Sequence, residues 1–378
     1  MAEIQGAYDP QFSAMADLLS ANVDSGADVG ASIAVTLDGN MVVDIWSGWF
    51  DESKTIPWQS DTITNVWSST KTVTSLAALV LVDRGDLDVF KPVAHYWPEF
   101  AAKGKGAIEV HHLLSHTSGI SGWERPVEVA DLYDWEKSTS MLAAQAPWWE
   151  PGSASGYHDR SFGHLVGEVI RRITGQKLGE FVANEIAGPL GADFHIGLDP
   201  SQFHRVSNVI PFQGPLPIDL VTDHDSVSYK TLSGPAWEPP VSWTAEWRQA
   251  DIGAANGHGN ARSLARLLSV VACGGEIDGP HLLSPSTCDL IFQEQSNGVD
   301  LVLGVPLRFG IGYALKNESI PYLPNGRVCT WGGWGGSVIV VDRDRRLTVS
   351  YVMNRMEGGL GGKRGPDLVR AAYAALNT

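Results

Sequence analysis

The stretch that decides the fold is Val66-Trp67-Ser68-Ser69-Thr70-Lys71, which a long apolar segment follows directly. Apolar side chains recur there with the 3.6-residue period of a helix, at Val73, Leu76, Ala77, Val80 and Leu81. Gly85 can end that helix, since glycine is common just past a helix C-terminus. The spacing therefore predicts an apolar helix that begins at or near Ser68, with Lys71 three residues on and able to share its face.

Ser68 and Lys71 form the only Ser-x-x-Lys arrangement in the chain. A serine hydroxyl is a poor nucleophile until a neighbouring group takes its proton. A lysine in a partly buried, electropositive cleft can take it, because desolvation lowers the lysine pKa. A serine that caps the helix beside a solvated lysine would show the same spacing, so the motif alone leaves both interpretations open.

Strand-like segments lie toward both ends of the chain. Residues 31–37 and 41–46 are joined by Asp38-Gly39-Asn40, and an Asp-Gly turn between apolar runs is a strong hairpin signal. A second hairpin is expected from residues 337–341 and 347–352. Helices are expected near residues 10–23 and 366–376.

The middle of the chain is mostly helical in pattern and has no fixed-period repeat. We therefore predict an α/β (α+β) protein in which one antiparallel sheet, flanked by helices, is assembled from both termini. Its α/β domain would comprise residues 1–91 and 309–378, and residues 92–308 would form a mostly helical domain with insertions. The catalytic cleft would lie between the two, a common place for a pocket.

Composition limits the partners. The 378 residues are 43 % hydrophobic and 19 % charged, as in an ordinary globular protein. The formal net charge of −16 argues against nucleic acid or an anionic membrane as a partner, because both would repel the chain. No apolar run approaches the ~20 residues that cross a bilayer.

The first residues and the cysteines bear on location. Residues 1–6 lack a basic region followed by an apolar stretch, so we expect no signal peptide. Cys273, Cys288 and Cys329 are odd in number and far apart, which fits a reduced cytoplasmic protein with small buried thiols. No metal-binding spacing of His, Glu or Cys is present, so no metal site is expected.

Further segments follow the Ser-x-x-Lys stretch in a characteristic order. They are residues 87–100, with Pro92-Val93 and Pro98-Glu99; residues 108–120, with His111-His112-Leu113-Leu114-Ser115-His116-Thr117-Ser118-Gly119; residues 255–266; and residues 308–312. With these segments the sequence resembles, over almost its whole length, the class C β-lactamase-like serine hydrolases, and particularly the family VIII carboxylesterases. The resemblance implies a β-lactamase/transpeptidase-like fold, an acyl-enzyme on Ser68, a small-molecule ester as substrate and no cofactor. Short-chain acyl esters are the expected substrates.

Tyr157 stands where this family has the tyrosine of its Tyr-x-Asn motif. The resemblance implies that Tyr157 and Lys71 share the proton taken from Ser68, and a tyrosine beside an ammonium can ionise below its usual pKa of ~10. Asp159 departs from the family asparagine and is expected to line the substrate site. Its carboxylate could pair with Lys71 and hold it protonated, which would favour Tyr157 as the base and weaken β-lactamase activity.

The third family motif, Lys-Thr-Gly in β-lactamases, is replaced by Trp331-Gly332-Gly333, as in family VIII esterases. The loss of the lysine removes the charge that holds a β-lactam carboxylate, and Trp331 offers an apolar wall instead. Gly332 and Gly333 let the backbone approach a substrate closely. By resemblance, the backbone amides of Ser68 and Trp334 form the oxyanion hole.

The sequence also admits other interpretations. His111, His112 and His116 suggest a Ser-His-Asp triad, but the family signature that they occupy is structural, and no Gly-x-Ser-x-Gly elbow is present. An acyltransferase or amidase could use the same residues, and weak β-lactam hydrolysis could accompany either. A non-catalytic scaffold would not require Ser68, Lys71 and Tyr157 together. The sequence leaves the oligomeric state open.

Overall fold

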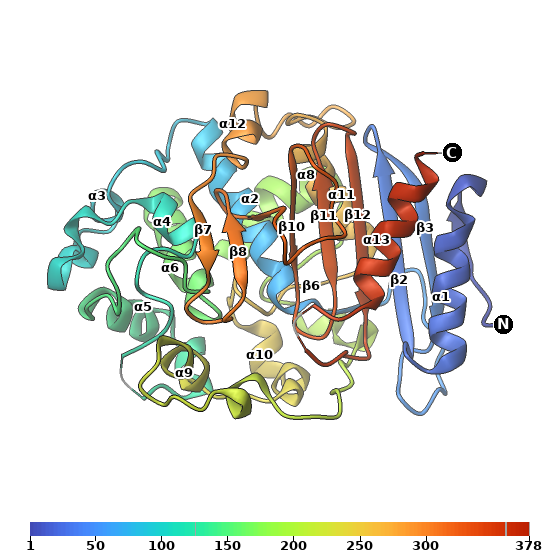
Figure 1. Ribbon diagram of the computed structural model, residues 1–378, viewed down its shortest axis with the longest axis horizontal. Helices are drawn as coiled ribbons and strands as arrows, with labels where there is room; N and C mark the ends of the chain where they lie inside the picture. Colours follow the sequence, from blue (N-terminus) through green and yellow to red (C-terminus); the bar gives the residue numbers. More distant parts are fainter. Residues whose placement is uncertain (125, 360, 378) are drawn as a thin grey trace.

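A nine-stranded antiparallel sheet forms the centre of the computed structural model (Figure 1). The structure describes residues 1–124, 126–359 and 361–377. The strand order in the sheet is β1-β3-β2-β12-β11-β10-β9-β8-β7. In chain order these strands are β1 (Gln5–Tyr8), β2 (Gly30–Leu37), β3 (Asn40–Gly48), β7 (Ser296–Val299), β8 (Pro306–Phe309), β9 (Ala314–Leu315), β10 (Val328–Gly332), β11 (Val338–Asp342) and β12 (Leu347–Met353). A small second sheet joins β4 (Ile63–Asn65) to β5 (Val206–Ser207) and β6 (His258–Gly259).

Both predicted hairpins are confirmed. Strands β2 and β3 pair in antiparallel fashion around the Asp38-Gly39 turn, where both residues have positive φ angles of 50° and 81°. Strands β11 and β12 form the second hairpin, and β12 pairs with β2 along its full length. Strands from the two ends of the chain therefore pair within one sheet, as the sequence predicts.

One face of the sheet is covered by the two terminal helices, α1 (Ser13–Ser25) and α13 (Arg364–Ala375), which lie side by side in Figure 1. Met15 and Leu19 of α1, Leu368 and Val369 of α13 and Val340 of β11 are members of one buried apolar cluster. Each such aliphatic side chain contributes about 1.5–3 kcal/mol on burial. These helices correspond to the amphipathic segments that the sequence predicts at 10–23 and 366–376.

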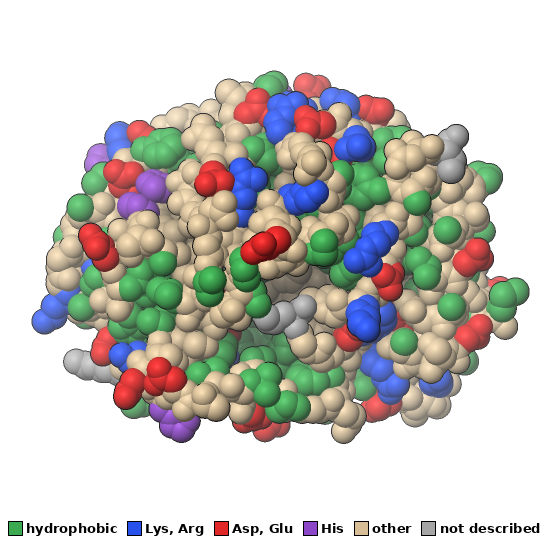
Figure 2. All heavy atoms as spheres, viewed as in Figure 1, with side chains coloured by type: hydrophobic (Ala, Val, Ile, Leu, Met, Phe, Trp, Pro, Cys, Tyr) green, Lys and Arg blue, Asp and Glu red, His purple; other side chains and the backbone are tan. Residues whose placement is uncertain are grey.

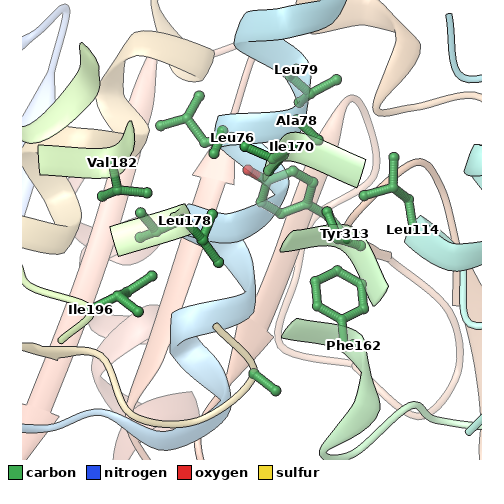
Figure 3. Close-up of a cluster of buried hydrophobic side chains, with 14 of the residues drawn as sticks. Leu76, Ala78, Leu79, Leu114, Phe162, Ile170, Leu178, Val182, Ile196 and Tyr313 are labelled. Carbon is green, nitrogen blue, oxygen red and sulfur yellow. The ribbon is translucent and has the colours of Figure 1, made fainter. Parts of the chain in front are cut away.

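The opposite face packs against α11 (Ala261–Ala272) and, behind it, α2 (Thr70–Asp83). Helix α2 is buried from Thr70 to Leu81, which explains why its sequence is apolar on more than one side. Figure 3 shows Leu76 and Leu79 of α2 among side chains of neighbouring helices, including Ile170 and Leu178. This packing against α6 (Ser161–Thr174), α7 (Leu178–Val182) and α11 buries the helix that carries Lys71.

The remaining helices lie between β4 and β7 in the chain. They are α3 (Val93–Tyr96), α4 (Val110–Leu114), α5 (Trp135–Ala144), α6 (Ser161–Thr174), α7 (Leu178–Val182), α8 (Gly188–Leu190), α9 (Val227–Ser233), α10 (Ala245–Gln249) and α12 (Pro285–Leu290). Of this set, α6, α7 and α12 pack against α2. The division at 91/92 and 308/309 remains a prediction. The sheet itself extends across the second boundary, since β7 lies wholly and β8 mostly before residue 309.

Cys273, Cys288 and Cys329 are buried free thiols, as expected. In the described ranges, no helix combines the length and the apolar character that a membrane span requires.

Candidate active site

Ser68 lies in a tight elbow between β4 and α2. It belongs to the 3₁₀ turn Trp67–Ser69, and the residue before it, Trp67, has a left-handed φ of 49°. This conformation costs a bulky residue about 1–3 kcal/mol and persists only where the surroundings hold it. Trp67 is 2 % exposed, and its ring packs on Trp247 at 5.7 Å and on Trp334 at 5.2 Å between centroids. Aromatic packing therefore fixes the direction in which the Ser68 hydroxyl points.

Lys71 is buried one turn along α2, with its Nζ 3.0 Å from Ser68 Oγ. The same nitrogen donates to the carbonyl of Asp159 at 2.7 Å and to the carbonyl of Ala254 at 2.9 Å. Burial lowers the pKa of Lys71 to about 7, the Asp159 carboxylate opposes this shift, and the Arg160 guanidinium adds to it. A neutral Lys71 has two N–H bonds for the two carbonyls, which leaves its lone pair directed at the Ser68 hydroxyl.

Tyr157 lies against this pair from the loop before α6. Its ring centroid is 4.7 Å from Lys71 Nζ, and its hydroxyl accepts a hydrogen bond from Trp331 Nε1 at 3.2 Å. Burial raises the pKa of Tyr157 above its ordinary range, and the Asp159 carboxylate raises it further, while hydrogen bonds with Ser68 and Trp331 lower it only in part. The expectation that Tyr157 ionises below its usual pKa is therefore wrong in direction, because desolvation outweighs the hydrogen bonds that lower the pKa.

Asp159 contacts Lys71 through its backbone carbonyl only. Its carboxylate instead forms an ion pair with Arg160, with 3.1 Å between Oδ2 and Nη1. The expected Asp159–Lys71 carboxylate pair is therefore corrected, and the reason is that the next residue in the chain supplies a nearer cation. With the carboxylate held there, the hydrogen-bond partners of Lys71 Nζ are Ser68 Oγ and the backbone carbonyls of Asp159 and Ala254.

The turn after β10 closes the site on the side of the sheet. Gly333 must be glycine, because a Cβ there would lie 2.1 Å from the carbonyl oxygen of Val66. Ser337 ties the turn to the elbow by donating to the same Val66 carbonyl at 2.9 Å. Within the described ranges, the backbone N–H of Trp334 has no acceptor, so it remains free to bind a ligand.

These residues surround a cavity of about 940 Å³. Figure 2 shows the hollow near the middle of this face, with hydrophobic side chains around it and Lys and Arg side chains on the side toward α13. The predicted site residues on its wall are Ser68, Tyr157, Asp159, Trp331, Gly332, Gly333 and Trp334. Lys71 lies behind Ser68, outside the lining. The structure thus brings all the predicted site residues together.

Sequence reasoning missed several residues of the site. Arg160, Ile218, Leu232 and Trp237 line the cavity. Asp300, from the loop between β7 and β8, accepts a hydrogen bond from the backbone N–H of Tyr157 at 3.0 Å and so anchors the Tyr157 loop. Only Arg160, a charged residue directly after the motif, carried a signal in the sequence.

The histidines of the 108–120 segment have structural partners, as expected. His112 Nδ1 accepts from the backbone of Glu109 at 3.0 Å, and His116 Nδ1 accepts from the backbone of His158 at 3.1 Å. Burial lowers the pKa of His116 well below its ordinary value, so this ring is neutral. No hydrogen bond joins Ser68 to a histidine anywhere in the described chain. Among the described residues, no group of three or more His, Cys, Asp or Glu side chains could hold a metal ion.

Comparison with known proteins places this site in a family. A family model described as Beta-lactamase matches residues 15–374. The chain belongs to the beta-lactamase family. The β-lactamase/transpeptidase-like fold expected from the sequence is confirmed by this match and by the crystal structure of a family VIII carboxylesterase, which has a TM-score of 0.93 and 40 % identity, with 99 % of this chain and 100 % of that chain covered.

Two curated relatives within the beta-lactamase family carry the name esterase. Esterase/beta-lactamase LipL of Mycobacterium tuberculosis is 33 % identical over 369 residues, which cover 93 % of this chain and 83 % of LipL. Esterase EstB of Burkholderia gladioli is 28 % identical over 396 residues, covering 96 % of this chain and 97 % of EstB. The similarity to the esterase branch, and to family VIII in particular, is therefore confirmed.

Proposed function

We propose that this family member is a serine carboxylesterase that hydrolyses short-chain acyl esters through an acyl-enzyme on Ser68. The observation that carries the proposal is the 3.0 Å contact between Ser68 Oγ and the buried Nζ of Lys71. A lysine with a pKa of about 7 is neutral in half of the molecules at neutral pH. General-base catalysis is most effective when the pKa of the base lies near the working pH.

In acylation, Ser68 Oγ attacks the ester carbonyl carbon while Lys71 Nζ takes its proton. The Tyr157 hydroxyl, which is protonated because its pKa is raised, then donates its proton to the leaving alkoxide and regains one from Lys71. The bond from the acyl carbon to the alcohol oxygen breaks and the bond to Ser68 Oγ replaces it. Water then attacks the acyl-enzyme along the reverse proton route, which releases a carboxylic acid and restores Ser68.

The negative charge of the tetrahedral intermediate needs donors. The backbone amides of Ser68 and Trp334 are the proposed oxyanion hole, and the Trp334 amide is unpartnered within the described ranges. The rigid elbow and the Gly333 contact fix these amides before the substrate arrives. One such donor is typically worth about 3 kcal/mol of transition-state stabilisation.

Apolar groups fit the cavity better than charged ones. Trp331 stands in the position of the β-lactamase lysine, its ring packs on Tyr157 at 5.0 Å between centroids, and Leu232 and Leu303 continue the apolar wall. Uncharged acyl esters would therefore bind better than the carboxylate of a β-lactam, and β-lactam hydrolysis would be weak. The relatives named esterase support the same substrate class.

Turnover of chromogenic esters tests the proposal. Wild type, Ser68→Ala and Ser75→Ala would be assayed against p-nitrophenyl acetate, butyrate and a long-chain ester, with a chromogenic cephalosporin alongside. Ser75 is a matched control because it is a buried serine of α2 whose hydroxyl donates to the Gly312 carbonyl at 2.9 Å, and it does not line the cavity. We expect fast release from short esters in wild type and Ser75→Ala and none in Ser68→Ala. Equal turnover in wild type and Ser68→Ala would contradict the proposal.

The size of the cavity favours one alternative, acyl transfer to an alcohol or amine on the same residues. About 940 Å³ exceeds what a short ester fills and leaves room for an acceptor beside the acyl-enzyme. Product analysis in the presence of added alcohols separates the two functions. A product that is mostly the transferred ester, at alcohol concentrations far below that of water, would favour the transferase.

A further inference from the structure

Asp159 and Arg160 form an ion pair at the wall of the cavity, beside Lys71. The Arg160 guanidinium is 5 % exposed, and its Nη1 both lies 3.1 Å from Asp159 Oδ2 and donates to the carbonyl of Thr231 at 2.9 Å. The Asp159 side chain is 21 % exposed, so it borders the cavity. Neither residue is explained by the proton route through Ser68, Lys71 and Tyr157.

We propose that Arg160 is a positioning residue that holds the Asp159 carboxylate in an ion pair away from Lys71, so that Lys71 can reach its neutral, proton-accepting state. The inference rests on the proposed function and adds a residue to it. It also gives a role to Asp159, which stands at the position of the family asparagine, and to its ion-pair partner.

A hydrogen bond between Lys71 and the backbone of Asp159 keeps the two residues close, so the Asp159 carboxylate needs another partner. The Asp159 carbonyl accepts a hydrogen bond from Lys71 Nζ at 2.7 Å, so the carboxylate of the same residue cannot move far from the ammonium. An unpaired carboxylate there would attract Lys71 and keep its third proton in place, since an opposite charge within ~4–6 Å favours the charged form. Arg160 supplies a competing cation: burial lowers its pKa and the Asp159 carboxylate opposes this shift, and a guanidinium stays protonated in proteins.

Arg160 is itself held from two sides. Its acceptor residue, Thr231, is fixed by a 2.6 Å hydrogen bond between its Oγ1 and Ser121 Oγ. The guanidinium lies 4.3 Å from the ring centroid of Trp237, which packs edge-on against Trp247 at 4.9 Å. Trp247 also packs on Trp67, the residue before the nucleophile. Arg160 is thus braced by the same aromatic stack that sets the Ser68 elbow.

The other titratable groups around Lys71 carry no charge that could replace this pair. Tyr157 is protonated because its pKa is raised, and the pKa values of His116 and His158 are lowered by burial, that of His158 to about 4. Asp300 acts on the far side of Tyr157, bonded to its backbone N–H at 3.0 Å. The charge that Lys71 experiences is therefore set mainly by Asp159 and Arg160.

The test is the pH dependence of kcat/KM for p-nitrophenyl butyrate, with the rate of fluorophosphonate labelling of Ser68 as a second readout. Arg160→Gln removes the cation and frees the carboxylate, so the acid limb should move to higher pH by about one unit. Asp159→Asn should move the limb to lower pH. In the Asp159→Asn background the Arg160→Gln change should cause a clearly smaller shift, because the carboxylate that it would free is gone.

Conservative variants separate positioning from simple structural support. Arg160→Lys keeps the charge, so its limb should stay near that of wild type even if its rate falls. In Arg160→Gln, a lower rate at every pH with an unshifted acid limb would overturn the inference. An unshifted acid limb in Asp159→Asn would overturn it as well, and this second variant tests the inference even if Arg160→Gln does not fold. Loss of Ser68-dependent turnover in wild type would be a different result, since it would refute the proposed esterase itself.

Discussion

The protein contains two buried lysines whose surroundings look alike and whose chemistry differs. Lys71 and Lys105 are both nearly inaccessible, each Nζ makes three hydrogen bonds, and each lies close to an aromatic ring, Tyr157 at 4.7 Å and Phe100 at 5.2 Å. Lys105 donates to three backbone carbonyls, those of Ala102, Ala143 and Gln145. Lys71 has two carbonyls and one hydroxyl, that of Ser68.

The difference lies in the third partner. A carbonyl can only accept, so Lys105 must keep all three protons to satisfy its surroundings. A hydroxyl can donate as well, so the Lys71–Ser68 bond can reverse direction when Lys71 is neutral. Burial lowers the pKa of both groups, to about 7 for Lys71 and about 8 for Lys105. Burial alone therefore does not make a lysine a base; a partner that can give up a proton does.

Replacement of Lys71 should have the largest effect. Lys71→Met removes the proposed proton acceptor of Ser68, and kcat/KM for p-nitrophenyl butyrate should fall by at least about 10³-fold. Thermal unfolding followed by circular dichroism checks that the variant is folded. Activity within tenfold of wild type would show that another group is the base.

Replacement of Lys105 should act on stability instead. Lys105→Met leaves three carbonyls without their donor, and the free energy of unfolding should fall by about 3 kcal/mol in urea titrations. The folded fraction should keep kcat/KM near that of wild type, because Lys105 does not border the cavity. Lys103→Met, at an exposed position two residues away, is the control and should change neither quantity. A large loss of specific activity in Lys105→Met would contradict the contrast between the two lysines.

Removal of the Tyr157 hydroxyl should affect catalysis while leaving the hydrogen-bond partners of Lys71 in place. Tyr157→Phe retains the ring beside Lys71 but loses the hydroxyl that is proposed to pass a proton to the leaving alkoxide. We expect kcat to fall by about 10²-fold, and the effect should shrink for esters whose alcohols leave readily. Equal losses for good and poor leaving groups would argue against a proton-donor role.

The smallest effect is that of pH on the wild type. Lys71, the proposed base, can accept a proton only when it is neutral, so kcat/KM should fall as the pH drops through about 7, approaching tenfold per unit below that value. The direction of the change follows because a base acts in its neutral form. The position of the limb follows from the lowered pKa of Lys71, since an unperturbed lysine, with a pKa near 10.4, would place the limb far into the alkaline range. A limb near pH 10 would assign the base to a group in an ordinary environment.

Much of the fold follows from local patterns. The helical period after Ser68, the Asp38-Gly39 turn and the apolar strands near both ends predict α2 and the two hairpins correctly, because each depends on near neighbours in sequence. Strand β7 could not be found this way, since it is mostly exposed and has no alternation of apolar and polar residues. Its loop to β8 nevertheless supplies Asp300 and part of the cavity wall.

The members of the site were predictable from motif order, whereas their electrostatics were not. The partner of the Asp159 carboxylate depends on Arg160, whose position is set by Thr231 and Trp237, more than 70 residues along the chain in each case. The pKa of Tyr157 depends on how many side chains bury it, which no local pattern records. Their roles in catalysis remain predictions.

The central claim is that neutral Lys71 makes Ser68 a nucleophile. The most direct test is the rate at which a fluorophosphonate labels Ser68 in wild type and in Lys71→Met, measured at pH values on both sides of the Lys71 pKa, with the labelled peptide identified by mass spectrometry. The account predicts labelling of Ser68 in wild type that rises through pH of about 7, and labelling in Lys71→Met that is slow and lacks this rise. Labelling of another residue, or the same rate and pH dependence in both proteins, would contradict it.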